Sequence, residues 1–268
     1  MRFRLLVFCF LGVFVQFGFD LKNNPTPIVE PEYRPFAPGE FLKYNIHYGI
    51  VNAGEATFSV NDSLQLIKNK PHYKVRITGK SYKSWDLFYK VRDYYYSYID
   101  SASMQPTVYS RNVQEGDYKD KESFWFKPKE YKAKGKNSEG ELEIEIPNQI
   151  QDLASMIYYA RSIKFYEKEQ GFYLPMNVFF ASEWYKCGAE FIGYENIKTT
   201  IGTFRCMKII PKLVEGRVFK GQDDMVVYVS ADENQIPIRI ESEIFVGSIK
   251  VDLIEYENLK YPLRSKLD

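Results

Sequence analysis

Apolar and polar residues alternate one by one in many short stretches of the chain, and this pattern constrains the fold most. Leu42, Tyr44 and Ile46, for example, are separated by single polar residues. A period of two places such residues on one face of a β-strand. The alternation recurs, with turn-forming residues between most of the segments, at residues 56–60, 73–77, 124–126, 142–146, 225–229, 236–240 and 245–253. The sequence therefore predicts a mainly β fold, a large antiparallel sheet arranged as an open barrel or a sandwich.

The first two of these segments predict a β-hairpin. We place its turn at Asn52, Ala53 and Gly54, because glycine adopts a positive φ without steric cost. His47 then falls on the solvent side of the first strand, and we interpret it as an exposed residue of the scaffold. A second, solvated hairpin is predicted at residues 131–141, YKAKGKNSEGE, where the charges nearly cancel.

One segment, residues 147–168, has a helical period instead. Its apolar residues recur at the spacing of a single helix face: Ile150, Leu153, Met156, Ile157 and Ala160. Asn148 is a suitable N-cap, so the segment predicts one amphipathic helix of about four turns with this apolar stripe against the sheet. A polar stripe lies beside it and contains Asp152, Ser155, Tyr159 and Ser162.

The composition describes a globular chain with balanced charge. Of 268 residues, 45% are hydrophobic and 17% aromatic, enough to form the core of one large domain. Lys and Arg number 36 against 35 for Asp and Glu, so no excess of positive charge exists to attract nucleic acid. We therefore expect no nucleic-acid partner.

The N-terminal segment predicts export. Arg2 and Arg4 precede an apolar run from Leu5 to Val15, which is shorter than the roughly 20 residues of a membrane-spanning helix. We expect a signal peptide at residues 1–19, with an uncleaved anchor as the alternative, and an extended proline-rich leader at residues 20–38. Residues 39–262 are then expected to form a single β-rich exported domain, although two β halves with a seam near residues 170–177 stay possible. This organisation predicts a periplasmic or envelope protein of a Gram-negative bacterium, without an integral membrane span after cleavage.

Residues for metal binding or nucleophilic catalysis are sparse. His47 and His72 are the two histidines, and neither has a second ligand at a metal-binding spacing. We interpret His72, which follows Pro71, as a solvated loop residue, and we expect no metal, no cofactor and no Ser or Cys hydrolase. In an oxidising compartment Cys187 and Cys206 could form a disulfide, or each could be a small buried hydrophobic residue.

Six residues are candidates for binding a ligand: Trp85, Asp93, Asp152, Tyr158, Arg161 and Trp184. The aromatic residues belong to an unusual excess, 22 Tyr and 20 Phe, which suits stacking on sugars or lipid chains but also suits ordinary strands. Arg161, on the helix with Asp152, would either clamp the helix to the sheet or grip an anionic ligand. Asp93 and Glu183 are candidates for a pair of catalytic carboxylates.

Five segments, taken in order, resemble the exported bacterial domain-of-unknown-function family 3108. They are GEFLKYNIHYGIVNAGEATFSV, KVRDYYYSYID, QDLASMIYYAR, GTFRCMKIIP and VYVSADENQIPIRIESEIFVGSIKVDLIEY, which together extend from about Gly39 to Tyr256. The resemblance implies an all-β exported domain with a packed helix. The family has no established activity, cofactor or catalytic residue, so the resemblance assigns no chemistry.

These observations together favour a non-catalytic protein of the cell envelope. We expect a binding or scaffold domain whose partner is an apolar lipid, a glycan or an envelope protein. The alternative is a carboxylate-dependent hydrolase that acts on envelope polysaccharide. An assembly factor is a third possibility, and it would present a broad exposed apolar patch instead of an enclosed pocket.

Overall fold

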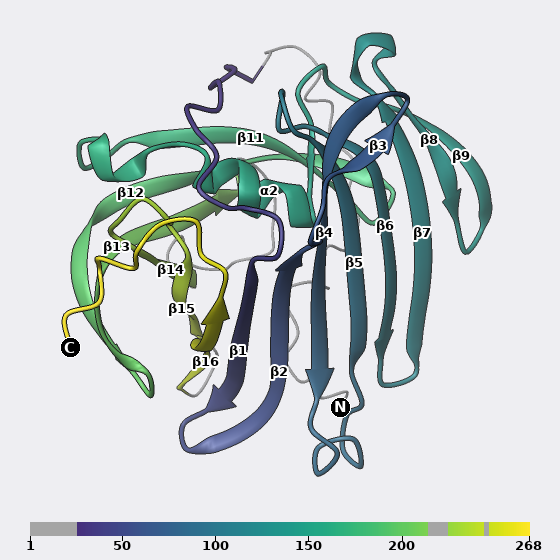
Figure 1. Ribbon diagram of the computed structural model, residues 1–268. Coiled ribbons are helices and arrows are strands. Elements are labelled where there is room, and N and C mark those ends of the chain that lie inside the picture. The colour runs from purple at the N-terminus through teal and green to yellow at the C-terminus, as the bar shows by residue number, and fades with distance from the viewer. Residues whose placement is uncertain (1–25, 214–224, 244–246) are drawn as a thin grey trace.

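The structure, a computed structural model, describes residues 26–213, 225–243 and 247–268 (Figure 1). The predicted signal peptide lies outside the described residues. Strands dominate and, within the described ranges, one α-helix accompanies them. The elements in chain order are β1 (Phe41–Tyr48), β2 (Val51–Val60), β3 (Gln65–Ile67), β4 (Lys70–Ser81), β5 (Arg92–Asp100), β6 (Pro106–Glu115), β7 (Tyr118–Lys127), β8 (Lys132–Asn137), β9 (Gly140–Glu145), β10 (Gln151–Asp152), α2 (Leu153–Arg161), β11 (Tyr173–Phe180), β12 (Glu183–Thr199), β13 (Gly202–Leu213), β14 (Met225–Ser230), β15 (Pro237–Glu243) and β16 (Ser248–Glu257).

All strands join one sheet, and this confirms the predicted fold class. The order is β10-β11-β12-β13-β14-β15-β16-β1-β2-β4-β5-β6-β7-β8-β9, with β3 beside β4, and every pair except β10 with β11 is antiparallel. The order has two ends, β9 and β10, so the sheet is an open barrel. Figure 1 shows it curving until β11 and β12 lie across from β4 to β7, with α2 between them at the upper end. Residues 170–177 contain the start of β11, the second strand from the β10 end of this sheet.

Aromatic rings fill the space between the two arms of the curved sheet. Phe179 of β11 contacts Phe124 and Phe126 of β7, with ring centroids 4.9 Å and 5.2 Å apart, and Tyr109 of β6 at 6.2 Å. All four side chains are buried. Edge-to-face packing of this kind stabilises a core beyond the area it buries. Much of the aromatic excess therefore serves the core.

The first hairpin forms as predicted, but its turn lies elsewhere. β1 pairs with β2, and the turn is at Gly49 and Ile50, where Gly49 has a φ of 55°. Gly54 lies inside β2, and it is required for a different reason. A Cβ on Gly54 would lie 2.4 Å from the carbonyl oxygen of Lys80 on β4, closer than van der Waals contact allows.

The helix is shorter than predicted, and its polar stripe is buried along with Ile150 and Leu153 of its apolar stripe. It begins at Leu153, because residues 151 and 152 pair with β11 in an extended conformation. Asp152, Ser155, Tyr159 and Ser162, the predicted polar stripe, are buried, whereas the apolar residues Met156, Ile157 and Ala160 are half-buried. Each buried polar group has a hydrogen-bond partner close by: Ser162 Oγ donates to Tyr158 O at 2.9 Å, and Tyr159 Oη donates to Val29 O at 2.5 Å. Local pairing thus makes a polar helix face compatible with the core.

The described part of the proline-rich leader, residues 26–38, packs on the domain. It is extended, as predicted, but it is not a free tether, because the ring of Phe36 is buried against Tyr73 and Tyr158. Its backbone also bonds to the end of α2, where Glu32 N–H donates to Ser162 O at 2.9 Å.

The predicted solvated hairpin at residues 131–141 corresponds to β8 and β9. Glu143 of β9 is exposed and pairs with two lysines of β8.

Candidate functional site

Arg161 forms a clamp inside the protein. Its guanidinium donates two hydrogen bonds to the carboxylate of Glu40, at 2.6 Å and 2.8 Å, and its Nε donates to Asn234 O at 3.2 Å. The rings of Phe36 and Tyr158 cover the guanidinium. Both charged side chains are almost fully buried. The partner of Arg161 is therefore Glu40, just before β1, and not Asp152, and the clamp joins the end of α2 to β1 and to the β14–β15 turn.

Asp152 is the N-cap of α2. Its Oδ1 accepts hydrogen bonds from the backbone N–H of Ala154 and Ser155, at 2.9 Å and 2.8 Å, and Ser155 Oγ accepts from the N–H of Asp152. Ser97 of β5 donates to Asp152 Oδ2 at 2.5 Å, which ties the helix to the sheet. Burial raises the pKa of Asp152 to about 6, although these hydrogen bonds act against the shift. This arrangement is a capping box in which the carboxylate holds the helix N-terminus.

Asp93 lies on the inner face of β5, fully buried, and its nearest acidic partner is Glu115 of β6. Its Oδ1 accepts from Gln114 N–H at 3.1 Å, while Oδ2 has no donor partner among the described residues. Burial first and the charge of Glu115 second raise the pKa of Asp93 to about 8, and burial also raises the pKa of Glu115. The buried Asp93 carboxyl group therefore holds its proton more tightly than an exposed carboxyl group does, and it lies near a second acidic side chain, Glu115.

A cluster of charged residues lies near this pair on the same inner face. Arg111 of β6 pairs with Glu122 of β7, Nε to Oε1 at 2.9 Å, and also with Asp120. The guanidinium stacks on the ring of Phe180, 4.6 Å from its centroid. Glu122 in turn accepts hydrogen bonds from Ala181 N–H and Ser182 Oγ at the turn between β11 and β12. Arg111 and Glu122 thus join the two arms of the sheet.

The stability of the protein is expected to fall as pH rises because of Asp93. A carboxyl group with a raised pKa in the folded state binds its proton more tightly there than in the unfolded chain. The resulting stabilisation is complete below about pH 4 and is lost as pH approaches 8. From pH 5 to pH 9 we expect the free energy of unfolding to fall by about 4 kcal/mol less in Asp93→Asn than in the wild type, because the asparagine amide does not titrate.

Urea unfolding of both proteins across this pH range measures the difference. Asp117→Asn, in the exposed turn between β6 and β7, is the matched control and is expected to follow the wild type. If the free energy of unfolding depended on pH in the same way in the wild type and in Asp93→Asn, a raised pKa of Asp93 would be contradicted.

The other predicted site residues lie apart from the helix. Trp184, on β12, donates its Nε1–H to Glu145 O at 3.1 Å. Glu183 is exposed and accepts a hydrogen bond from Tyr185 Oη at 2.8 Å, so it is not the acidic partner of Asp93. Asp152, Tyr158 and Arg161 share the helix region, whereas Asp93 and Trp184 lie on strands β5 and β12 and Trp85 lies in the β4–β5 loop. Ligand binding by the six residues stays a prediction.

The predicted disulfide between Cys187 and Cys206 is not formed, and both thiols are free. In the antiparallel register, Cys206 of β13 lies opposite Glu195 of β12, eight residues beyond Cys187. At the rise of a strand this separates the two cysteines by roughly 25 Å, far beyond the reach of a disulfide. Burial raises the pKa of each thiol to about 12, as expected for small buried residues.

Both histidines have structural partners that the sequence did not indicate. His72 is buried on β4 and not in a solvated loop, with Nε2 2.8 Å from Thr107 Oγ1 and Nδ1 2.8 Å from Lys70 O. His47 points away from the core as predicted, but it is not a bystander. Its Nε2 lies 3.1 Å from Asp252 of β16, which also accepts two hydrogen bonds from Arg239 of β15.

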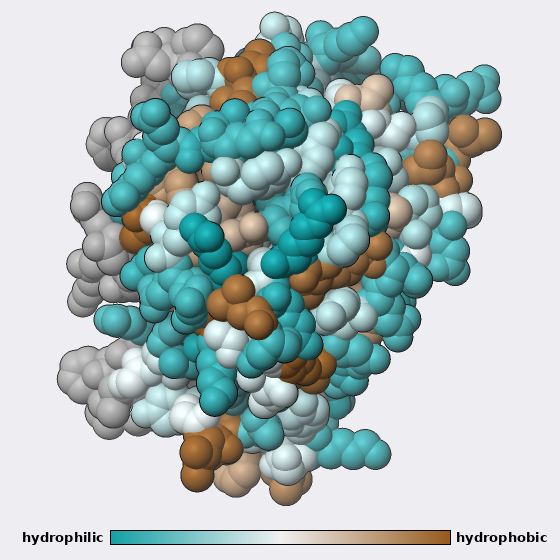
Figure 2. All heavy atoms as spheres, turned by 60° about the vertical axis from the view of Figure 1, so that its left-hand side comes forward, coloured by the Kyte–Doolittle hydropathy of each residue, from teal (hydrophilic) through white to brown (hydrophobic). Residues whose placement is uncertain are grey.

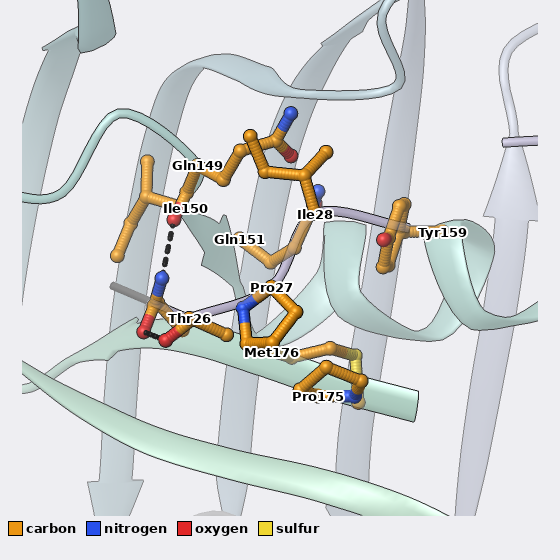
Figure 3. Close-up of a pocket in the computed structure, with 10 residues that line it drawn as sticks. Thr26, Pro27, Ile28, Gln149, Ile150, Gln151, Tyr159, Pro175 and Met176 are labelled. Atoms are coloured by element: carbon orange, nitrogen blue, oxygen red, sulfur yellow. Dashed lines mark hydrogen bonds between the residues drawn. The ribbon is translucent and has the colours of Figure 1, made fainter. Parts of the chain in front are cut away.

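A shallow pocket lies between the leader and the β10–β11 end of the sheet. Figure 3 shows Thr26, Pro27 and Ile28 of the leader facing Gln149 to Gln151, Tyr159 and Met176. Thr26 Oγ1 donates to Asn177 Oδ1 at 2.6 Å, and Asn177 Nδ2 donates to Gln149 O at 2.8 Å. The free space is on the scale of roughly one water molecule, so the pocket does not hold a lipid chain or a sugar.

Large apolar side chains are exposed where two loops meet at one end of the sheet. Ile50 and Val51 of the β1–β2 turn are 99% and 45% exposed, and Leu87 and Phe88 of the β4–β5 loop are 89% and 81% exposed. We call these four residues the apolar loop end. Hydrophobic residues gather at the lower tip of the molecule in Figure 2, the end at which Figure 1 places these two loops. Exposed apolar residues in contiguous groups are a common feature of interaction sites.

Hydrogen bonds to β2, β4 and β5 fix the conformation of the β4–β5 loop. Trp85 Nε1–H donates to Asn52 O at 2.8 Å, which joins the loop to β2, and the ring packs edge-on against Phe88. Asp86 accepts hydrogen bonds from Ser81 Oγ and from both terminal nitrogens of Arg92. Two successive turns complete the loop, from Trp85 N–H to Tyr82 O and from Phe88 N–H to Trp85 O. Leu87 and Phe88 are therefore presented outward by a braced loop. Of the six predicted residues, Trp85 alone contacts the apolar loop end. The sequence signal that could have identified this surface is the apolar pair Leu87-Phe88, which lies in a turn and not in an alternating strand.

One solved structure has a similar fold. A crystal structure from Brucella abortus, a beta-barrel-like protein of domain of unknown function DUF1849, superposes with a TM-score of 0.54 at 10% identity and covers 82% of this chain and 97% of that chain. A candidate lipoprotein from Parabacteroides distasonis reaches a TM-score of 0.31 at 13% identity, covering 83% of this chain and 97% of that chain. A comparison with curated proteins finds no match.

None of the helices within residues 26–213, 225–243 and 247–268 is long and apolar enough to cross a bilayer. The sequence model of one family, described as a protein of unknown function, matches residues 43–254, which is most of the chain and includes every strand from β2 to β15. The chain therefore belongs to family DUF3108.

Proposed function

We propose that this chain is an exported cell-envelope protein that acts by binding a partner at its surface and not by catalysis. The apolar loop end is the observation that carries the proposal. Ile50, Leu87 and Phe88 expose most of their side chains on a braced support, although burying each would be favourable by about 1.5–3 kcal/mol. A partner with apolar character, such as a lipid or an envelope protein, would supply that burial.

The roles of the charged side chains support a non-catalytic protein. Arg161 holds Glu40, Arg111 holds Glu122, and Asp252 holds both Arg239 and His47. These ion pairs connect strands to one another and to the helix, so the charged groups have structural partners. The ring cluster around Phe179 fills the interior, which favours binding on the surface over a ligand enclosed between the arms of the sheet.

Native mass spectrometry of gently purified protein, followed by a panel of immobilised lipids and glycans, tests the proposal. We expect an apolar ligand or lipid to be retained and Leu87→Ser to weaken its binding. Leu66→Ser is the matched control, because Leu66 of β3 is also exposed, at 73%, but lies outside the apolar loop end. Lack of binding to every lipid and glycan, with no envelope protein captured by cross-linking in cells, would refute the proposal.

Asp93 and Glu115 favour one second candidate, a carboxylate-dependent hydrolase of envelope polysaccharide. A carboxyl group with a pKa of about 8 beside a carboxylate is an arrangement that general-acid catalysis uses. Asp93 is fully buried, so a substrate would need an opening to reach it. Incubation with cell-wall and surface polysaccharides, assayed for new reducing ends, decides between the candidates. We expect none from the wild type, whereas release that Asp93→Asn abolishes would establish the hydrolase.

A further inference from the structure

We infer that the apolar loop end docks on the surface of a bilayer that contains anionic phospholipid, inserting Leu87, Phe88 and Ile50 below the headgroups. This inference rests on the proposed function, namely that the chain acts by binding, and it names the partner of the apolar loop end. Three features carry it: the shape of the surface, its charge and the position of Trp85.

The shape of the apolar loop end suits a membrane better than a folded protein. The two loops project from the lower end of the molecule in Figure 1, and their large apolar side chains are exposed. A stable protein interface needs about 1,000 Å² of buried surface, and four side chains at a projecting tip supply only a fraction of it. A bilayer needs no matching pocket, because lipid chains deform around a few inserted side chains.

The charge around the apolar loop end is complementary to anionic lipid. Lys83 and Lys90 flank Leu87 and Phe88 in the sequence, and both are exposed. Asp86, the acidic residue between them, is paired with Arg92 and has its pKa lowered by that hydrogen bond, so its charge is compensated. The adjacent β6–β7 turn contributes Asp117 and Lys119, which offset one another. Lys83 and Lys90 therefore place two exposed positive charges beside Leu87 and Phe88, where they can meet lipid phosphates.

Trp85 lies at the level where a membrane interface would be. Its ring packs behind Phe88 and its N–H faces the carbonyl of Asn52, so its apolar part faces the tip and its polar part faces the protein. Tryptophan prefers the boundary between headgroups and hydrocarbon for the same reason. In this pose Leu87 and Phe88 enter the acyl region while the lysines stay among the phosphates.

Flotation of the full chain with vesicles tests the inference. The vesicles are phosphatidylcholine alone and phosphatidylcholine mixed with phosphatidylglycerol. We expect the wild type to float with the mixed vesicles and Leu87→Ser with Phe88→Ser to lower its partition coefficient at least tenfold. Replacing Lys83 and Lys90 by glutamine is expected to cost about fivefold per lysine on the mixed vesicles, and little on phosphatidylcholine. Leu66→Ser is expected to bind as the wild type does.

Fluorescence of Trp85, in a variant whose other two tryptophans are replaced by phenylalanine, gives a second readout. A blue shift on addition of mixed vesicles, absent from Leu87→Ser with Phe88→Ser, supports insertion at this end. The inference is overturned if the wild type does not float, if the double serine variant floats equally well, or if the surface instead mediates self-association that the variant abolishes. Retained binding on the lipid and glycan panel without flotation refutes the inference alone, whereas reducing-end release by the wild type refutes the proposed function.

Discussion

Replacing Glu40 by alanine is expected to lower the free energy of unfolding by about 3–5 kcal/mol, because it leaves the buried Arg161 guanidinium without a counter-charge. The pair is bidentate, at 2.6 Å and 2.8 Å, and both side chains are almost fully buried. Water cannot replace the lost carboxylate without opening the contact between α2 and β1. Urea unfolding followed by circular dichroism measures the loss.

A double variant separates the lost charge pair from lost packing. Glu40→Leu with Arg161→Met removes both charges and keeps most of the volume, so we expect it to regain most of the stability. Lys127→Ala, which breaks an exposed pair with Glu130, is the surface control and is expected to cost less than about 1 kcal/mol. A loss below about 1 kcal/mol for Glu40→Ala would show that Arg161 is not a buried clamp.

Replacing Phe179 by alanine is expected to lower the free energy of unfolding by a similar amount, about 3–5 kcal/mol, through a cavity between the arms of the sheet. The ring is fully buried and contacts Tyr109, Phe124 and Phe126. Because these rings belong to β6 and β7, the change weakens the contact between the two arms. Phe88→Ala, at an 81% exposed position, is the matched control and is expected to change stability by no more than about 0.5 kcal/mol.

Thermal and urea unfolding of the two phenylalanine variants measure this contrast. Equal destabilisation by Phe179→Ala and Phe88→Ala would mean that the arms of the sheet do not meet at Phe179. A neutral Phe88→Ala also makes the vesicle experiments interpretable, since any loss of flotation at this position then comes from the surface and not from unfolding.

The candidate site could be predicted only in part. Sequence reasoning selected Trp85 because it is aromatic, but it assigned no role to Leu87, Phe88 and Ile50, the residues that are exposed. Periodicity marks residues that can share a face, and it carries no information on a loop whose apolar residues remain in solvent. Exposure of that loop depends on the bond from Trp85 to Asn52 and the pairing of Asp86 with Arg92, which neighbours in space provide.

The sequence by itself determined the mainly β, antiparallel class, many of the strands and the presence of one helix, because the alternation of apolar residues is a local property of the backbone geometry. It also offered a clamp between helix and sheet as one of two roles for Arg161. Only the tertiary structure decided that Glu40 is the partner of Arg161, that the polar stripe of α2 is buried as well, and that Cys187 and Cys206 are far apart. Each of these depends on which distant segments the curvature and register of the sheet bring together, and a pattern with a period of two does not encode that choice.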